Sequence, residues 1–345
     1  MMTIARFAGV FALTLLGFTT ASAQSASPIL SGGAGFFGAS GGDNTFFQPV
    51  LAPVLAIPLG NNWLIESRAD LREVVARQFG TSGPYQGTFF GTLEYLQLDY
   101  NANSHLTITA GRFLTPFGIF NERMSAIWIN KFQDAPVIAA IGTAQGYSDG
   151  LMLRGAAISN SRYAVNYSAY FSTLSTIENL RSQRTAGGRV GVFIPGIRLE
   201  VGTSYQRKLQ NQRMNSYGND ISWTSDRLPL EVKGEWAHSL SGHGYWIYAA
   251  YRLSQFGGGN SPIARLEPIV RMQQFFRSSR PVSGDSLPST NVRLPGFGLN
   301  YYLPHEVRLN ASYGRELVSR GTDVNQWEFG ITYRFLFPLS RGDSR

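Results

Sequence analysis

The chain has no cysteine, little lysine and, after residue 23, no long apolar segment. The absence of cysteine excludes a disulfide framework, thiolate catalysis and cysteine-ligated zinc. No stretch after residue 23 holds the roughly 18 unbroken apolar residues that a membrane-spanning helix needs. If this chain spans a membrane, it does so as a closed β-barrel, because closure pairs every backbone group in lipid.

Apolar and polar residues alternate over much of the chain between Tyr163 and Phe337. In the clearest segment, Tyr245, Ile247, Ala249, Tyr251 and Leu253 lie on one face, opposite Trp246, Tyr248, Ala250, Arg252 and Ser254. This period of two is typical of a strand, and one polar face containing arginine suits a wall between lipid and water. The pattern predicts an all-β, transmembrane antiparallel barrel.

The alternating segments and the turn residues between them predict sixteen strands. The predicted strands span 29–40, 45–57, 61–77, 87–100, 105–113, 148–159, 162–174, 185–194, 197–207, 213–224, 229–240, 245–256, 263–276, 292–302, 306–317 and 324–337. Short, turn-rich connections alternate with longer ones, as expected when short turns face the periplasm and long loops face outward. We therefore expect one barrel domain over residues 24–345.

The first 23 residues resemble a cleaved secretory signal peptide. Arg6 supplies the positive start, residues 7–18 form a short apolar core, and Ala21-Ser22-Ala23 is an A-x-A cleavage site. The mature chain is therefore expected in the cell outer membrane. Removal of Arg6, with no acid in the segment, changes the formal net charge from +8 to +7.

The longest predicted connection, residues 114–147, is the third outer loop. Its apolar residues argue against disorder, and its length calls for a functional explanation. We expect the loop to fold toward the lumen and constrict it, with Glu122, Arg123, Lys131 and Asp134 at the constriction. The alternative is a surface cap or a subunit contact.

Arginine dominates the basic residues: only Lys131, Lys208 and Lys233 of the 30 are lysine. Arginine binds phosphate or carboxylate in a bidentate fork, although it also serves to balance lumenal acids. The residues predicted to line the pore are Arg68, Arg72, Arg154, Arg162, Arg198, Lys233, Arg252, Arg271, Arg308 and Arg334. Adding Arg189 and Arg265 makes twelve cations against eight lumenal acids, which predicts a modest preference for anions.

Other motifs lack the context that their chemistry needs. The glycines of Gly33-Ala-Gly35-Phe-Phe-Gly38 lie in a predicted strand with no helix after it, so a nucleotide site is not expected. The four histidines are scattered over turns and strand ends. We expect no catalytic residues, no metal, no cofactor and no nucleic-acid partner.

Three stretches resemble the phosphate-selective porin O/P family. They are GRFLTPFGIFNE at Gly111 to Glu122, LEPIVRMQQF at Leu266 to Phe275, and FGLNYYLPHEVRLNASYGR at Phe297 to Arg315. Two features depart from that family: lysine is scarce, and Pro338 to Arg345 follow the last strand. The scarcity of lysine puts a lysine-based phosphate site in doubt.

The resemblance implies a sixteen-stranded, trimeric outer-membrane channel in contact with the lipid bilayer and lipopolysaccharide. Its expected function is passive diffusion of small hydrophilic solutes, with a modest preference for anions such as phosphate, and it is not expected to be an enzyme. Two alternatives stay open: an outer-membrane barrel hydrolase, and a structural or adhesive barrel with a plugged lumen.

Overall fold

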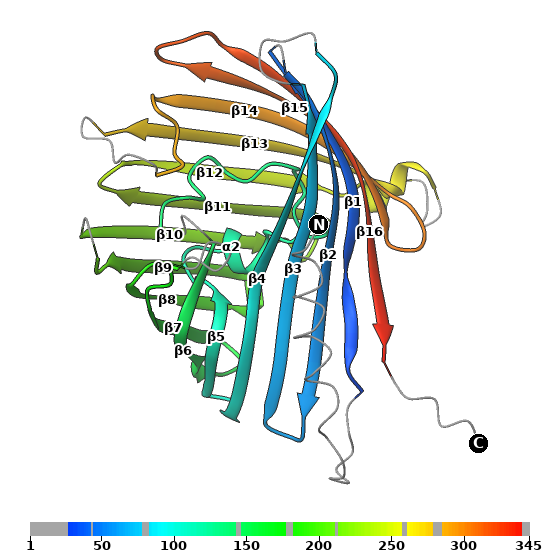
Figure 1. The fold of residues 1–345 in the computed structure, drawn as a ribbon. Helices are drawn as coiled ribbons and strands as arrows, with labels where there is room; N and C mark the ends of the chain where they lie inside the picture. The colour runs from blue at the N-terminus through cyan, green and yellow to red at the C-terminus, as the bar shows by residue number, and fades with distance from the viewer. Residues whose placement is uncertain are drawn as a thin grey trace, which may run out of the picture.

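The protein is a closed antiparallel β-barrel (Figure 1), seen in a computed structural model. The structure describes residues 27–42, 44–77, 83–142, 146–176, 182–210, 213–256, 261–278 and 285–339. The predicted signal peptide at 1–23 and the end of the chain after residue 339 lie outside the described residues. The sixteen predicted strands are all present, each paired with its neighbours in sequence.

Most strand bounds agree with the sequence to within two or three residues. The strands are β1 (Ile29–Gly41), β2 (Asn44–Leu59), β3 (Trp63–Ala76), β4 (Gln86–Asn103), β5 (Leu106–Leu114), β6 (Tyr147–Ser159), β7 (Ala164–Ser172), β8 (Thr185–Ile194), β9 (Leu199–Lys208), β10 (Met214–Thr224), β11 (Leu230–Ser239), β12 (Gly242–Tyr251), β13 (Leu266–Arg277), β14 (Val292–Tyr302), β15 (Val307–Val318) and β16 (Val324–Pro338).

The barrel closes between the first and last strands. β1 pairs with β16 along its whole length, from Ile29 opposite Pro338 to Gly41 opposite Gln326. This pairing leaves neither strand as an open edge, so the backbone groups of both are satisfied within the sheet. Closure is therefore what makes the sheet compatible with a hydrocarbon surround.

Alternate residues of each strand face opposite sides of this wall. In β12, Trp246, Tyr248 and Ala250 are buried on the inward face, whereas Ile247 between them points outward and is exposed. Val201 in β9 and Ile331 in β16 are likewise exposed on the outward face. An apolar outward belt over a closed sheet is what lipid requires.

Aromatic pairs lie toward both ends of the barrel. The rings of Trp63 and Tyr100 are 4.6 Å apart at the end that carries the short turns, called here the turn end. The rings of Tyr313 and Trp327 are 4.6 Å apart toward the opposite end, called the loop end. Amphipathic rings in two bands fit the two interfaces of a bilayer.

The largest error in the predicted bounds concerns β12 and β13. β12 begins at Gly242 rather than residue 245, because a tight turn at Leu240 and Ser241 lets pairing run to the tip of the hairpin. The last residues predicted for β12 and the first residues predicted for β13 instead form two short 3-10 helices, η3 (Leu253–Gln255) and η4 (Ile263–Arg265). Among the described residues, no helix is long and apolar enough to cross a membrane.

Ile247 offers the sharpest test of the outward face, because it lies in the middle of β12 opposite Gly234 and Met272. Val201 is the third residue of β9 and so lies nearer the turn end. We expect Ile247→Arg to cost about 2 to 4 kcal/mol of folding free energy in a bilayer, since an arginine there meets hydrocarbon.

Urea unfolding in lipid vesicles measures this cost, and heat-modifiable migration in gels reports folding. Ser161→Arg, in an exposed turn, is the matched control and should fold as the unmodified chain does. An Ile247→Arg protein with unchanged unfolding free energy would contradict the assigned register.

Candidate functional site

The connection between β5 and β6 folds into the barrel, where Figure 1 shows its short helix α2 (Phe120–Arg123) inside the ring of strands. We call residues 115–142 the inner loop. Its apolar side chains form one buried cluster with the inward face of β11 to β14. The loop contributes Phe117, Ile119, Phe120, Met124, Phe132, Ile138 and Ile141, and the wall contributes Ala237, Trp246, Tyr248, Ala250, Ile269, Phe275, Val292 and Leu294.

This cluster explains why the inward face of β12 is aromatic. Trp246 and Tyr248 would be costly in a water-filled lumen, but here they stack on each other with ring centroids 5.8 Å apart and pack against the loop. The alternation in the sequence showed which face they occupy. It did not show that a loop from another part of the chain covers that face.

A carboxylate from the wall holds the start of the inner loop. Glu235 accepts hydrogen bonds from the backbone N–H groups of Ile119 and Phe120, the latter at 2.8 Å. It also accepts one from the indole nitrogen of Trp246 at 2.8 Å. Two free N–H groups at the start of α2 thus find an acceptor, as buried backbone donors must.

Ion pairs hold the middle of the loop to β11 and β13. Asp134 pairs with Arg271 at 2.6 Å, and Lys131 pairs with Glu267 at 2.8 Å and with Glu231 at 3.2 Å. Lys131 and Asp134 were predicted at the constriction. The structure uses both as anchors against the wall.

Two wall arginines bind the loop from other strands. Arg308 of β15 is buried and donates to the backbone carbonyls of Ile127 and Asn130 at 2.9 and 2.6 Å. Arg68 of β3 donates to the hydroxyl of Ser125 at 3.0 Å. The apolar cluster and Arg308 hold the loop against β11 to β15, and Arg68 holds it from β3.

A space of about 490 Å³ remains between the inner loop and the opposite wall. We call it the passage. Glu122 and Arg123 face it from the loop, and Arg154, Arg189 and Glu66 are among the residues that face it from β3 to β8. The passage is therefore off-centre and lined by both signs of charge.

In two ion pairs beside the passage, the arginine side chain is more exposed than its acidic partner. The side chain of Arg123 is 44% exposed and that of its partner Glu200 is 13% exposed, at 2.7 Å. Arg154 is 39% exposed and its partner Asp99 is 2% exposed, at 3.6 Å. In both pairs the arginine therefore presents more of its surface to the passage than its acid does, and Glu66 and Glu122 are the acids that line this space.

Glu122 carries the opposing charge on the loop. Burial raises the pKa of its carboxyl above the ordinary value for glutamate, and the nearby charges of Arg154, Arg123 and Arg189 offset this only in part. Its negative charge is therefore lost at a higher pH than that of an exposed glutamate.

Three of the basic residues predicted to line the pore are neutralised within the wall. Arg68 is buried and pairs with Glu94. Arg72 pairs with Asp70 of its own strand. Lys233 pairs with Glu231 at 3.1 Å. These pairs balance charge in the wall and add little net field to the passage.

Other predicted positions lie near the turn end, away from the constriction. Arg162 precedes β7 in an exposed turn, and Arg198 follows the 3-10 helix η2 (Pro195–Ile197) with φ of 49°, paired with Asp226 at 2.6 Å. Placing them on strands was wrong, because β7 and β9 begin later than predicted. Arg252 follows β12 and lies over the ring of Tyr302, 3.9 Å from its centroid. Arg334 is exposed near the end of β16.

The prediction missed three inward acids: Glu94, Asp99 and Asp220. Asp220 is buried beneath Arg189 at 2.6 Å, and its alternation with Tyr217 and Ile221 could have revealed it. Glu94 lies at a β-bulge, where the register shifts between Arg68 and Ala69. Because a bulge re-aims side chains, simple alternation does not place Glu94.

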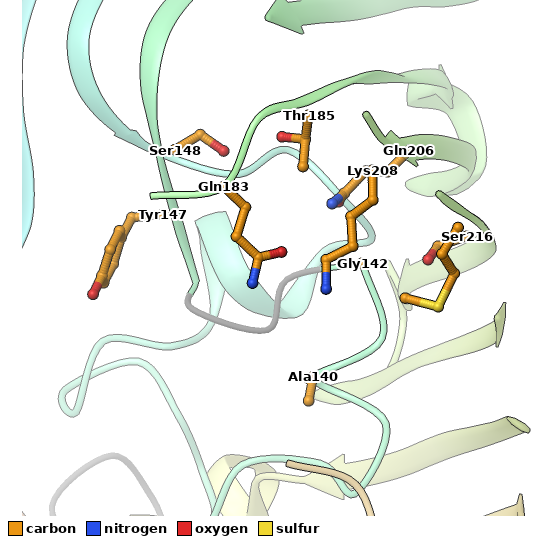
Figure 2. A pocket seen from close by; sticks show the side chains of 10 residues that line it. Ala140, Gly142, Tyr147, Ser148, Gln183, Thr185, Gln206, Lys208 and Ser216 are labelled. Atoms are coloured by element: carbon orange, nitrogen blue, oxygen red, sulfur yellow. The ribbon is translucent and has the colours of Figure 1, made fainter. Parts of the chain in front are cut away.

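A second, smaller space of about 40 Å³ lies toward the loop end, where Ser148, Gln183, Thr185 and Lys208 converge (Figure 2). Lys131 and Lys233 form ion pairs, whereas no acid of the described residues pairs with Lys208. Within the same residues, no three side chains of metal-binding type gather together.

Comparison with known proteins supports the fold. No protein-family model and no curated protein matches the chain. Salmonella typhi OmpF in complex with daunomycin is similar, with a TM-score of 0.61, 15% identity, and 90% of this chain and 98% of that chain covered.

Two further solved structures are similar to this chain in fold at low sequence identity. An anion-selective porin from Comamonas acidovorans has a TM-score of 0.57 at 12% identity, covering 90% of this chain and 99% of that one. Pseudomonas putida OprB at low pH has a TM-score of 0.58 at 9% identity, covering 97% and 98%. The chain thus has the fold of outer-membrane porins.

Deletion of Met124 to Ile141 tests whether the inner loop restricts the lumen. The deletion removes most of the loop side of the apolar cluster, so single-channel conductance should rise at least about twofold. Arg271→Gln is the control: it removes one anchor and leaves the loop in place, and conductance should change little. A folded deletion protein of unchanged conductance would mean that the loop does not set the narrowest section.

Proposed function

We propose that this protein is an outer-membrane channel for passive diffusion of small hydrophilic solutes, with a modest preference for anions. The observation that carries the proposal is the passage of about 490 Å³ beside the inner loop. The apolar outward face supports a location in lipid, and the resemblance in three sequence stretches supports a trimer in a membrane that contains lipopolysaccharide.

The passage also favours a channel over the two alternatives. A loop that filled the lumen completely would leave no space of about 490 Å³ beside it. A hydrolase needs a nucleophile within hydrogen-bonding reach of a base. The residues that line the passage include Ser168 but no histidine.

The proposed anion preference rests on exposure and not on a count of charges. Buried acids that the sequence did not assign to the lumen, such as Asp99 and Asp220, cancel much of the predicted surplus of arginine. The most exposed charges with an ion-pair partner there are the ends of Arg123 and Arg154, which face the passage together with Arg189, Glu66 and Glu122. One similar structure is described as an anion-selective porin. We infer a preference for small anions as a class, phosphate included.

Removing both exposed arginines tests this preference. Two unit charges about 4 Å apart in water interact by about 1 kcal/mol, so chloride should permeate a few-fold better than potassium. The double substitution Arg123→Gln with Arg154→Gln should bring the permeability ratio close to unity. Reversal potentials across a planar bilayer under a KCl gradient give this ratio, and the effect should weaken at high salt.

The double substitution Lys233→Gln with Arg271→Gln is the matched control. It removes the same charge from Lys233, which pairs with Glu231 within the wall, and from Arg271, which pairs with Asp134 of the inner loop. Neither side chain lines the passage, so selectivity should change less. A cation-selective channel, or equal losses in both double variants, would falsify the assignment of selectivity to Arg123 and Arg154. A folded protein without conductance would reject the channel itself.

The raised pKa of Glu122 predicts a pH dependence with a definite sign. As pH falls, this carboxyl becomes neutral before an exposed glutamate does, so the passage becomes more positive and its anion preference increases. Reversal potentials measured from pH 8 to pH 4 report the change. In Glu122→Gln the anion preference should be the stronger one at every pH from 8 to 4, and it should not increase as pH falls. An increase as large as in the unmodified protein would contradict this role of Glu122.

A further inference from the structure

Two histidines face each other across the hairpin formed by β11 and β12. His238 and His243 are register partners, brought together by the tight turn at Leu240 and Ser241. Both side chains are exposed on the outward face, at the loop end of the barrel. Their ring centroids are 6.1 Å apart and their planes make an angle of 40°. Although the sequence suggested scattered histidines, the hairpin makes these two neighbours.

Aromatic rings flank the pair on both sides. Trp236 stacks on His238 with centroids 6.2 Å apart and planes 8° apart. Phe276 of β13 stacks on His243 at 5.0 Å. Neither imidazole makes a hydrogen bond within the described residues, so the stacking orients the rings and leaves their nitrogens available.

We propose that His238 and His243 form a binding site for one divalent transition-metal ion, such as Zn²⁺, Cu²⁺ or Ni²⁺. Neutral imidazole is a preferred ligand of these ions. With a metal–nitrogen distance of about 2.0–2.1 Å, two rings on a tetrahedral ion lie with centroids roughly 5 Å apart. Small rotations of two exposed side chains bring the observed 6.1 Å to that value.

The chain supplies two ligands, and water fills the other positions. Among the described residues, no carboxylate or carbonyl accepts a hydrogen bond from either imidazole, a support that strengthens metal binding in other proteins. The site is therefore weaker than a structural zinc site. It lies on the outward face, so it is independent of the passage and of the proposed function as a channel.

Trp236 provides a local signal for the test, because Cu²⁺ bound to His238 quenches the indole stacked on it. Tag-free, folded full-length protein is titrated with Cu²⁺ in detergent without chelators, following tryptophan fluorescence. Partial, saturable quenching is expected, together with a stoichiometry of one ion per chain by calorimetry. A chelator added in excess should reverse the quenching, whereas Zn²⁺ should compete only weakly because Cu²⁺ binds imidazole more tightly.

Variants separate this site from binding elsewhere. His238→Ala and His243→Ala should each weaken binding at least about tenfold, because one imidazole alone does not chelate. His305→Ala, at the opposite end of the barrel, should bind as the unmodified chain does. Trp236→Phe should lose most of the quenching and keep the calorimetric stoichiometry.

Two results would overturn the proposal. One is the absence of saturable Cu²⁺ binding by the unmodified protein. The other is equal binding by a double variant in which both His238 and His243 are alanine, which would place the ion elsewhere. Heat-modifiable migration confirms that each variant is folded, and both substitutions lie on an exposed surface where alanine removes no buried contact.

Discussion

The structure depends on the pairing of β1 with β16, because an open sheet edge in hydrocarbon would leave a row of backbone groups without partners. Closure divides every strand into an outward face that meets lipid and an inward face that encloses the lumen. The inward side chains then need either water or a covering. Both solutions occur here: the inner loop covers the face that contains Trp246, and the opposite wall keeps a passage.

The inner loop makes the lumen of the barrel asymmetric. Its apolar side chains bury the aromatic inward face of β12, while Glu235, Arg271 and Arg308 satisfy its backbone and acidic groups from three different strands. These polar contacts are directional, whereas the apolar packing is not, so the polar contacts determine where the loop lies. The passage is consequently displaced toward β3 to β8.

The sequence predicted the strands well because their signal is local. The alternation of Trp246 and Ile247 needs no knowledge of the rest of the chain, and it gave the correct faces. Errors arose where a strand end depends on its partner, as for Arg162 and Arg198. Partners distant in sequence could not be predicted: no local pattern links Arg308 to the carbonyls of Ile127 and Asn130.

The same limit applies to charge. A count of residues treats Arg154 and its partner Asp99 as equal and opposite, but the field in the passage depends on depth: the arginine is 39% exposed and the acid 2% exposed. A buried acid acts on a solute mainly by orienting and partly neutralising its arginine. Under the proposed function, selectivity follows from which member of each ion pair reaches the water, and net composition leaves that property undetermined even when every strand is assigned correctly.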